Sequence, residues 1–268
     1  MPTFQTPEPI TAVVEVVAGS VRLVASDRDD TVVEVQPRDP SRASDVRAAE
    51  QARVDFRNGT LTVAAGRKYI SLGRGGAVEI DIALPVRSRL QASSAYADVQ
   101  GEGLLANCRF SSASGDVALD TLEGNIKADT ASGDVAVQRV LGSASISTAS
   151  GDATIGELEG DLKFQAASGG ITIGRLHGNA RTQTASGSVA VARAVNGAFT
   201  AQTSSGEVEV GIPEGTAARL DLVTSSGVVS NGLESSAGPA EGDETVVVHA
   251  RTGSGDILVR RATGPTAA

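Results

Sequence analysis

Acidic side chains recur at one position of the chain, eighteen residues apart. The four in strict register are Asp98, Asp116, Asp134 and Asp152, with Glu207 and Asp256 at the equivalent place later in the sequence. On parallel strands about 4.8 Å apart, stacked carboxylates repel by about 1 kcal/mol in water, and a bound Ca²⁺ would relieve that repulsion. However, calcium-binding nonapeptides supply an aspartate every nine residues, and Gly170, Ser188 and Val228 interrupt this column. The column is therefore a weak metal candidate, and we expect no cofactor.

A column of serines is the second feature that could support chemistry. Eight Ser-Gly pairs recur, and their serines are Ser114, Ser132, Ser150, Ser168, Ser186, Ser205, Ser226 and Ser254. A nucleophilic serine needs a base and an oxyanion site, and neither a GxSxG motif nor a histidine column accompanies these serines. The sequence thus predicts no catalytic residue and no enzyme activity. We expect the hydroxyl groups to bond local backbone groups at a turn.

Other reactive residue types are few. His177 shares a turn column with Glu123 and Asn196, which predicts a solvated turn residue. Cys108 aligns with Ile126, eighteen residues later, and is therefore predicted to be a small buried hydrophobe. As the single cysteine, it cannot form a disulfide within the chain. Three of the five phenylalanines, Phe110, Phe164 and Phe199, fall at predicted inward positions, which weakens the case for a sugar-stacking surface.

Charge and hydropathy restrict the partners and the compartment. A formal net charge of -9, from 23 basic and 32 acidic residues, gives no basic footprint for nucleic acid or anionic lipid. The first residues, MPTFQTPEPI, do not resemble a secretory signal, and no run of eighteen apolar residues occurs. We expect a soluble, cytoplasmic protein without a nucleic acid partner or a transmembrane segment. Association with the cell surface is the alternative.

The eighteen-residue repeat predicts the elements that position these columns. From Ser114 the chain reads SGDVALDTLEGNIKADTA and then SGDVAVQRVLGSASISTA. Each unit has two segments with apolar residues at alternate positions, such as Val117 with Leu119 and Ile126 with Ala128, which is the pattern of a strand face. A glycine such as Gly124 lies between the segments, where it tolerates the positive φ of a tight corner.

A single unit cannot bury its own apolar face, so the units must stack as coils. The sequence therefore predicts an all-β fold: a parallel β-helix (β-solenoid) with about 18 residues per coil and two glycine corners per coil. Parallel strands joined by crossovers within one sheet are overwhelmingly right-handed, so we expect right-handed coils.

The regions outside the strict repeat are predicted as follows. Residues 1–90 form a β-strand region and cap that is continuous with the solenoid, residues 91–262 form the solenoid repeats, and residues 263–268 are a disordered tail. Within the first region, Ala12–Val17, Ser20–Ala25 and Thr31–Val35 read as short strands, the first two separated by an AGS turn. Residues 38–51 read as a helix or a charged loop, and Asn58-Gly59 predicts a hairpin leading into the array.

Four segments carry a resemblance to a known family. They are SVRLVASDRDDTVVEV from Ser20, VEIDIALP from Val78, the SASGDV repeats, and TGSGDILVRRA from Thr252. In these segments, and over nearly its whole length, the chain resembles a bacterial β-strand-repeat family labelled “putative adhesin”, a domain of unknown function. The resemblance implies a right-handed parallel β-helix. It implies no reaction and no catalytic residue, because the family has none assigned.

Three functions are compatible with this reading. The first is a non-enzymatic, adhesin-like binding or scaffold module whose regular faces dock an unknown protein partner, envelope-associated or regulatory. The second is a structural protein that assembles end to end, because the last coil of a β-helix presents unpaired strand edges. The third is a carbohydrate-active β-helix enzyme, which would need a cluster of catalytic acids that the sequence does not display.

Overall fold

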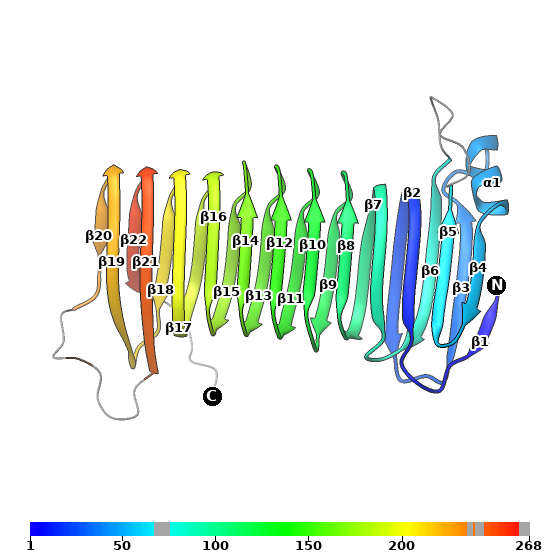
Figure 1. Cartoon of the computed structure of the whole chain (residues 1–268), viewed down its shortest axis with the longest axis horizontal. Helices are drawn as coiled ribbons and strands as arrows, with labels where there is room; N and C mark the ends of the chain where they lie inside the picture. The colour runs from blue at the N-terminus through cyan, green and yellow to red at the C-terminus, as the bar shows by residue number, and fades with distance from the viewer. Residues whose placement is uncertain (67–75, 235–237, 239–243, 263–268) are drawn as a thin grey trace. The chain divides into compact units, whose positions relative to one another are not determined.

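The computed structural model describes residues 1–66, 76–234, 238 and 244–262. These residues are mostly β-strand, which confirms the predicted all-β class, and they include one short helix (Figure 1). The chain forms two compact units, residues 1–137 and 138–268. The predicted tail, residues 263–268, lies outside the described residues.

The first unit begins with the strands of the predicted cap and continues into regular coils. Its elements are β1 (Thr3–Gln5), β2 (Thr11–Ser26), β3 (Asp30–Pro37), α1 (Ala43–Glu50), β4 (Arg53–Arg57), β5 (Thr60–Ala65), β6 (Val78–Pro85), β7 (Arg89–Leu105), β8 (Cys108–Ser112), β9 (Val117–Leu122) and β10 (Ile126–Thr130), and β11 (Val135–Leu141) then leads into the second unit.

Strand β2 occupies an unexpected place in this unit. It pairs in parallel with β5 and β6 on one side and with β7 on the other, so the first long strand lies inside the stack (Figure 1). The prediction of two strands split by an AGS turn is wrong. One strand runs through both segments, and Gly19, with φ of 130°, turns it from one face of the coil to the other. Here the glycine bends a strand without ending it.

The coil formed by β5 and β6 is the terminal coil of the first unit, and other elements cover it. Strand β3 pairs antiparallel with β6, and β4 pairs antiparallel with β5 through the predicted hairpin at Asn58 and Gly59. Residues 43–50 of the segment predicted as helix or loop form α1, which packs against β3 and β6. The N-terminal segment therefore closes the first unit with a cap, as solenoids require.

The second unit begins with coils of eighteen residues, and its later coils are longer. Its elements are β12 (Ala144–Thr148), β13 (Ala153–Glu159), β14 (Leu162–Ala166), β15 (Ile171–His177), β16 (Ala180–Ser186), β17 (Val189–Ser205), β18 (Val208–Ile212), β19 (Thr216–Ser226), β20 (Val229–Asn231), β21 (Glu244–Ser254) and β22 (Ile257–Arg261). Leu162 pairs with Ala144 and with Ala180, so neighbouring parallel strands are shifted by one repeat.

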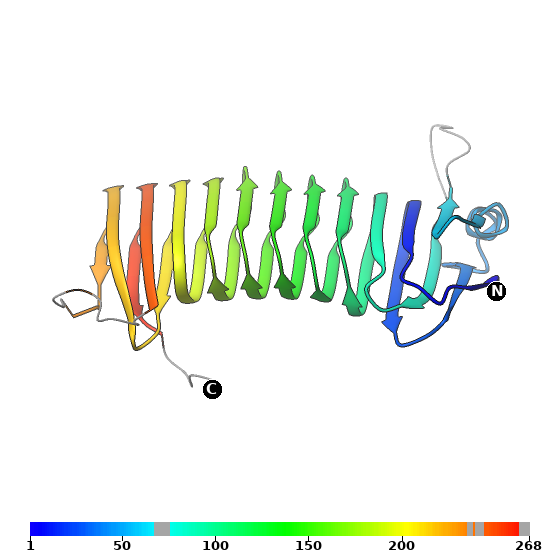
Figure 2. The same ribbon diagram turned by 60° about the horizontal axis from the view of Figure 1, so that its bottom comes forward.

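Coil order departs from chain order in this unit too. Strand β21 pairs in parallel with β17 and with β19, and β22 pairs with β18 and with β20. In Figures 1 and 2 the red β21 therefore lies between the yellow β17 and the orange β19. The last coil in the sequence is thus inserted one place inward, and β19 with β20 forms the terminal coil.

The predicted apolar columns form the core. In the column two residues after each glycine, Val117, Val135, Ala153, Ile171, Val189, Val208 and Ile257 are all buried. Val229 is the exception, because it lies in the terminal coil and is 41% exposed. The second predicted corner is confirmed at Gly160, whose φ of 145° suits glycine alone.

At Gly133, the corner of a Ser-Gly pair needs glycine for a different reason. Gly133 does not have a positive φ. A Cβ atom on it would instead overlap the carbonyl oxygen of Gly115 in the preceding coil. Glycine at this corner permits two backbones to stack in contact.

Candidate functional site

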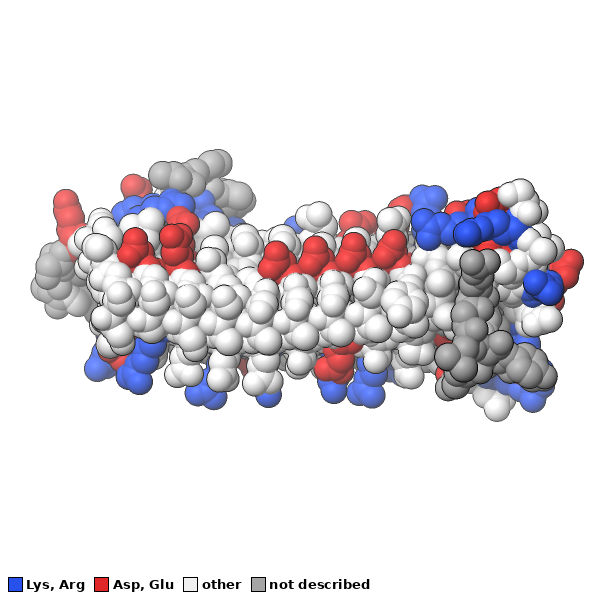
Figure 3. Space-filling model, turned by 90° about the horizontal axis from the view of Figure 1, so that it is seen from above, with Lys and Arg blue, Asp and Glu red and all other residues white. Residues whose placement is uncertain are grey.

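The acidic column serves the backbone of the neighbouring coil. In the first unit, the Asp116 amide donates to Asp98 Oδ1 at 3.1 Å, and the Asp134 amide donates to Asp116 Oδ1 at 2.9 Å. In the second unit, the Gly170 amide donates to Asp152 Oδ1 at 2.7 Å. In each unit the carboxylates border a band of uncharged residues at this corner (Figure 3). Each of these three aspartates therefore accepts a hydrogen bond from a corner amide that no strand ladder satisfies.

The column does not bring together a set of metal ligands. Within residues 1–66, 76–234, 238 and 244–262, no three His, Cys, Asp or Glu side chains are grouped closely enough to hold an ion. The stacked aspartates lie one per coil, and Asp98, Asp116 and Asp152 each use an oxygen on a backbone amide. The structure thus gives three of the four weak cation candidates a structural role, and the fourth, Asp134, supplies the amide that Asp116 accepts from.

We predict that the D116A variant loses about 1 kcal/mol of unfolding free energy, because the Asp134 amide loses its acceptor. The D116N variant keeps an Oδ1 acceptor and should stay within about 0.5 kcal/mol of wild type. Urea denaturation followed by circular dichroism measures both. If millimolar Ca²⁺ raised the melting temperature of wild type but not that of D116N, the column would be a cation site and this assignment would fail.

We expected the hydroxyl groups of the Ser-Gly serines to bond backbone groups at the turn, and this prediction is wrong. The serines of the Ser-Gly pairs are exposed, and the hydroxyl that bonds the corner backbone lies two residues earlier. Thr148 Oγ1 accepts from the Gly151 amide at 2.8 Å, whereas Thr184 Oγ1 donates to the Gly169 carbonyl of the preceding coil at 2.9 Å. The buried threonines hold the corner, and the exposed serines only cover it. Both residue types are small hydroxyls, so the column alone did not separate these roles.

The two histidines and the cysteine lie in different environments. Arg175 Nε donates to His177 Nε2 at 2.8 Å, so His177 is a half-buried strand residue with a partner and not a solvated turn residue. His249 Nδ1 lies 3.2 Å from Asp221 Oδ2. Cys108 is buried as predicted, and burial raises the pKa of its thiol to about 12, which keeps it protonated and unreactive.

The terminal coil of the second unit differs from all other coils in its burial. Its inward residues Leu220 and Leu222 are half-buried, and Val229 is 41% exposed. Their in-register neighbours one coil inward, Val248 and Ile257, are each 0% exposed. Among the described residues, no further strand stacks on this layer, so the apolar columns end there.

Both strands of this coil are edge strands. Among the described residues, β19 runs beside β21 on one side only, and β20 beside β22 on one side only. Strand β19 is eleven residues long, without proline or a bulge. Its outward face carries an exposed valine, Val223, between charged and polar residues. Such an edge is a template for another strand, and proteins usually protect it.

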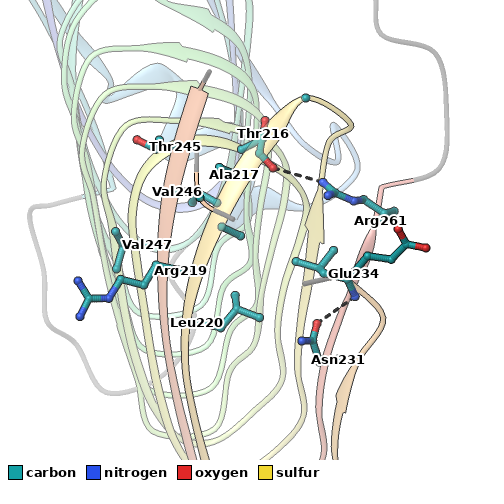
Figure 4. Close-up of a pocket in the computed structure, with 14 residues that line it drawn as sticks. Thr216, Ala217, Arg219, Leu220, Asn231, Glu234, Thr245, Val246, Val247 and Arg261 are labelled. Atoms are coloured by element: carbon teal, nitrogen blue, oxygen red, sulfur yellow. Dashed lines mark hydrogen bonds between the residues drawn. The ribbon is translucent and has the colours of Figure 1, made fainter. Parts of the chain in front are cut away.

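A hollow of about 760 Å³ opens beside this edge. Leu220 reaches into it from β19 and Val246 lines it from β21, while Asn231 and Arg261 supply polar groups at its rim (Figure 4). The Arg261 guanidinium donates to the carbonyl oxygens of Pro213 and Thr216, at 2.8 and 3.3 Å, and so fixes the start of β19. The hollow and the two edges form one surface, which we call the β19–β20 edge.

Sequence reasoning did not locate this surface. One signal was present, because LDLVTSSGVV (Leu220 to Val229) places valines at outward or corner positions that are polar in most other units. The repeat spacing also loosens after Gly187, to nineteen, twenty-one and twenty-eight residues. Neither signal states that the coil before the last one is spatially terminal.

The comparisons with known proteins concern the fold. A family model described as Toastrack DUF4097 matches residues 13–260. A “putative lipid binding protein” from Parabacteroides distasonis is 15% identical, with 96% of this chain and 95% of that chain covered and a TM-score of 0.52. A “putative adhesin” from Bacteroides fragilis is 14% identical, with 96% and 95% covered and a TM-score of 0.49. The Parabacteroides structure has the same fold.

A search of curated proteins gave no match. In the part of the chain that the structure describes, no helix is both long and apolar enough to cross a membrane.

Proposed function

We propose that this chain, which belongs to the Toastrack DUF4097 family, is a non-enzymatic module that binds another protein chain by strand addition at the β19–β20 edge. One observation carries the proposal. The inward residues of the covered terminal coil, such as Leu61 and Ile80, are 0% and 1% exposed, whereas Val229 in the uncovered terminal coil is 41% exposed. Partner strands added to β19 and β20 would cover this layer as β3 and β4 cover the terminal coil of the first unit.

The physical basis is that of β-augmentation. A strand added to an exposed edge satisfies the unpaired backbone amides and carbonyls, and its alternate side chains fill the apolar layer behind the edge. The main-chain bonds supply affinity, while the pocket beside Leu220 supplies selectivity for an apolar side chain. We take the coils as right-handed, as expected for parallel crossover connections. The rigid stacked coils make the module a scaffold for this edge, in keeping with an adhesin-like role.

The proposal is tested by photo-crosslinking in the protein's own cells. A photoreactive amino acid replaces Val223 on the edge strand or, as the control, Gln183, which is exposed on β16 between two paired strands. We expect a protein adduct from position 223 that position 183 does not give. Its identity also reports whether the partner is cytoplasmic or at the cell surface. The same products from both positions, or none from position 223, would refute the proposal.

A further inference from the structure

We infer that the partner at the β19–β20 edge is a second copy of this chain, joined through the same edge in a two-fold dimer. The inference rests on the proposed function and names its partner. It follows from three properties of the second unit: the presence of two edges around one core, the pattern of charge on β19, and the area of the terminal coil.

The surface has two edges, not one. Strands β19 and β20 belong to the two faces of the same coil, and Leu220, Leu222 and Val229 project into the core between them. A single extended peptide pairs with one edge and leaves the other edge and half of the core open. The end of another solenoid brings two edges and a core layer at the same separation, so it covers all three.

Of the two terminal coils in the described part of the chain, one can supply that end. The terminal coil of the first unit is closed by β3 and β4, which run antiparallel to it, and by α1. Its core residues, such as Leu61 and Ile82, are already buried. The partner surface must therefore be the β19–β20 edge of another copy. An interface made by the same surface on both copies is closed, so it yields a dimer and not a filament.

The charges on β19 select the register. Its outward face carries Arg219 and Asp221, both exposed, on either side of the inward residue Leu220. Two-fold pairing makes the two β19 strands antiparallel, and centring it on Leu220 places each Arg219 opposite Asp221 of the partner. Leucine then meets leucine in the core layer. If the two-fold axis passed through residue 221 instead, Asp221 of one copy would lie directly opposite Asp221 of the other. Like charges in that position are destabilising.

The area suits a weak, reversible dimer. Strand β19 has eleven residues and spans roughly 36 Å, whereas β20 has three and spans roughly 10 Å, at about 3.3 Å per residue. Each edge with the side chains behind it is about 10 Å thick. The two edges thus offer about 450 Å² per copy, or roughly 900 Å² in total, which is the size of a weak interface.

The test measures the mass of the full chain in solution by sedimentation equilibrium, from about 1 to 100 μM. We expect wild type to form a dimer. For R219D we expect the dissociation constant of the dimer to rise about tenfold or more, because the introduced aspartate of each copy lies opposite Asp221 of the other copy. D221R should weaken the dimer by the same mechanism. An equimolar mixture of R219D and D221R should form a mixed dimer, because opposite charges then face one another at both places where position 219 of one copy meets position 221 of the other. R181D, a charge reversal on β16 away from the edge, should remain dimeric.

A second measurement covers the case in which D221R disturbs the fold through its contacts with His249 and Arg251. Residues directly opposite in an antiparallel pair lie about 5 Å apart, which a disulfide can bridge. The L220C variant should therefore form an intermolecular disulfide on mild oxidation. V223C should not, because the register separates the two copies of residue 223 by six residues, or about 20 Å.

The outcomes are distinguishable from those of the proposed function. A monomer at 100 μM, or equal crosslinking of L220C and V223C, overturns the dimer. In that event a different protein captured by the photoreactive group at position 223 would still support binding at the edge, and the absence of any adduct there would refute both.

Discussion

Replacing Phe164 with alanine is expected to lower the unfolding free energy by about 3–5 kcal/mol. Phe164 is one of the largest fully buried side chains, at 0% exposure on β14. It stacks in register on Ile146 and Thr182, one coil to either side. Neither neighbour can fill the vacated volume, because the coil backbones are fixed by parallel ladders on both sides. The lost burial of the ring and the remaining cavity therefore both lower the unfolding free energy of the variant.

Equilibrium urea unfolding measures the effect, with K163A as the matched control. Lys163 is the adjacent residue of β14 but points to solvent, so its truncation should cost less than about 0.5 kcal/mol. In a stacked-coil protein, destabilising one coil also weakens its interfaces with its neighbours. An F164A variant that unfolds with the wild-type midpoint would show that Phe164 does not fill the core.

The columns of the core could be predicted because each repeat obeys the same geometric rule. Val117, Val135 and Val189 recur at one offset, and the parallel register places equal offsets side by side in the stack. Alternation with period two then decides which side chains face inward. The same logic placed Cys108 in the core by its alignment with Ile126, and the two residues are indeed paired across β8 and β10.

The order of the coils could not be predicted, and the reason is the same regularity. Val229 and Ile257 occupy the same column, and either would stack on Val208 equally well as far as the pattern shows. The structure places Ile257 there and leaves Val229 at the surface. The choice depends on tertiary interactions of two whole coils. The candidate binding surface therefore had no direct signature in the sequence, since it is defined by which coil is terminal.

Chemical roles at the corner were only partly predictable. The glycine at the Ser-Gly pair is explained by contact between backbones, which a one-dimensional pattern does not reveal. The regular spacing of the acidic column is compatible with a row of cation sites. The hydrogen-bond partner of each carboxylate, however, depends on the direction of the backbone amide in the next coil. Asp98 Oδ1 accepts from that amide at 3.1 Å. Side-chain spacing indicates proximity, whereas hydrogen-bond partners follow from orientation.

The G169A variant is expected to lose about 3 kcal/mol or more, a large effect for the addition of one methyl group. A Cβ atom on Gly169 would overlap the carbonyl oxygen of Gly151 in the preceding coil and press on the Thr148 methyl group at 3.3 Å. The obstacle is backbone and not the end of a flexible side chain. The coils must therefore separate at this corner, where Thr184 also bonds the Gly169 carbonyl.

The matched control for G169A is S168A, which changes the exposed serine of the same Ser-Gly pair and should stay within about 0.5 kcal/mol of wild type. Together the two variants separate the structural roles of the pair, because a serine that held the corner would make S168A the more destabilising change. Urea midpoints measured for both variants decide the matter. Comparable stability of G169A and wild type would mean that the coils are not in backbone contact at this corner, whereas a large loss shows that the glycine sets the stacking distance.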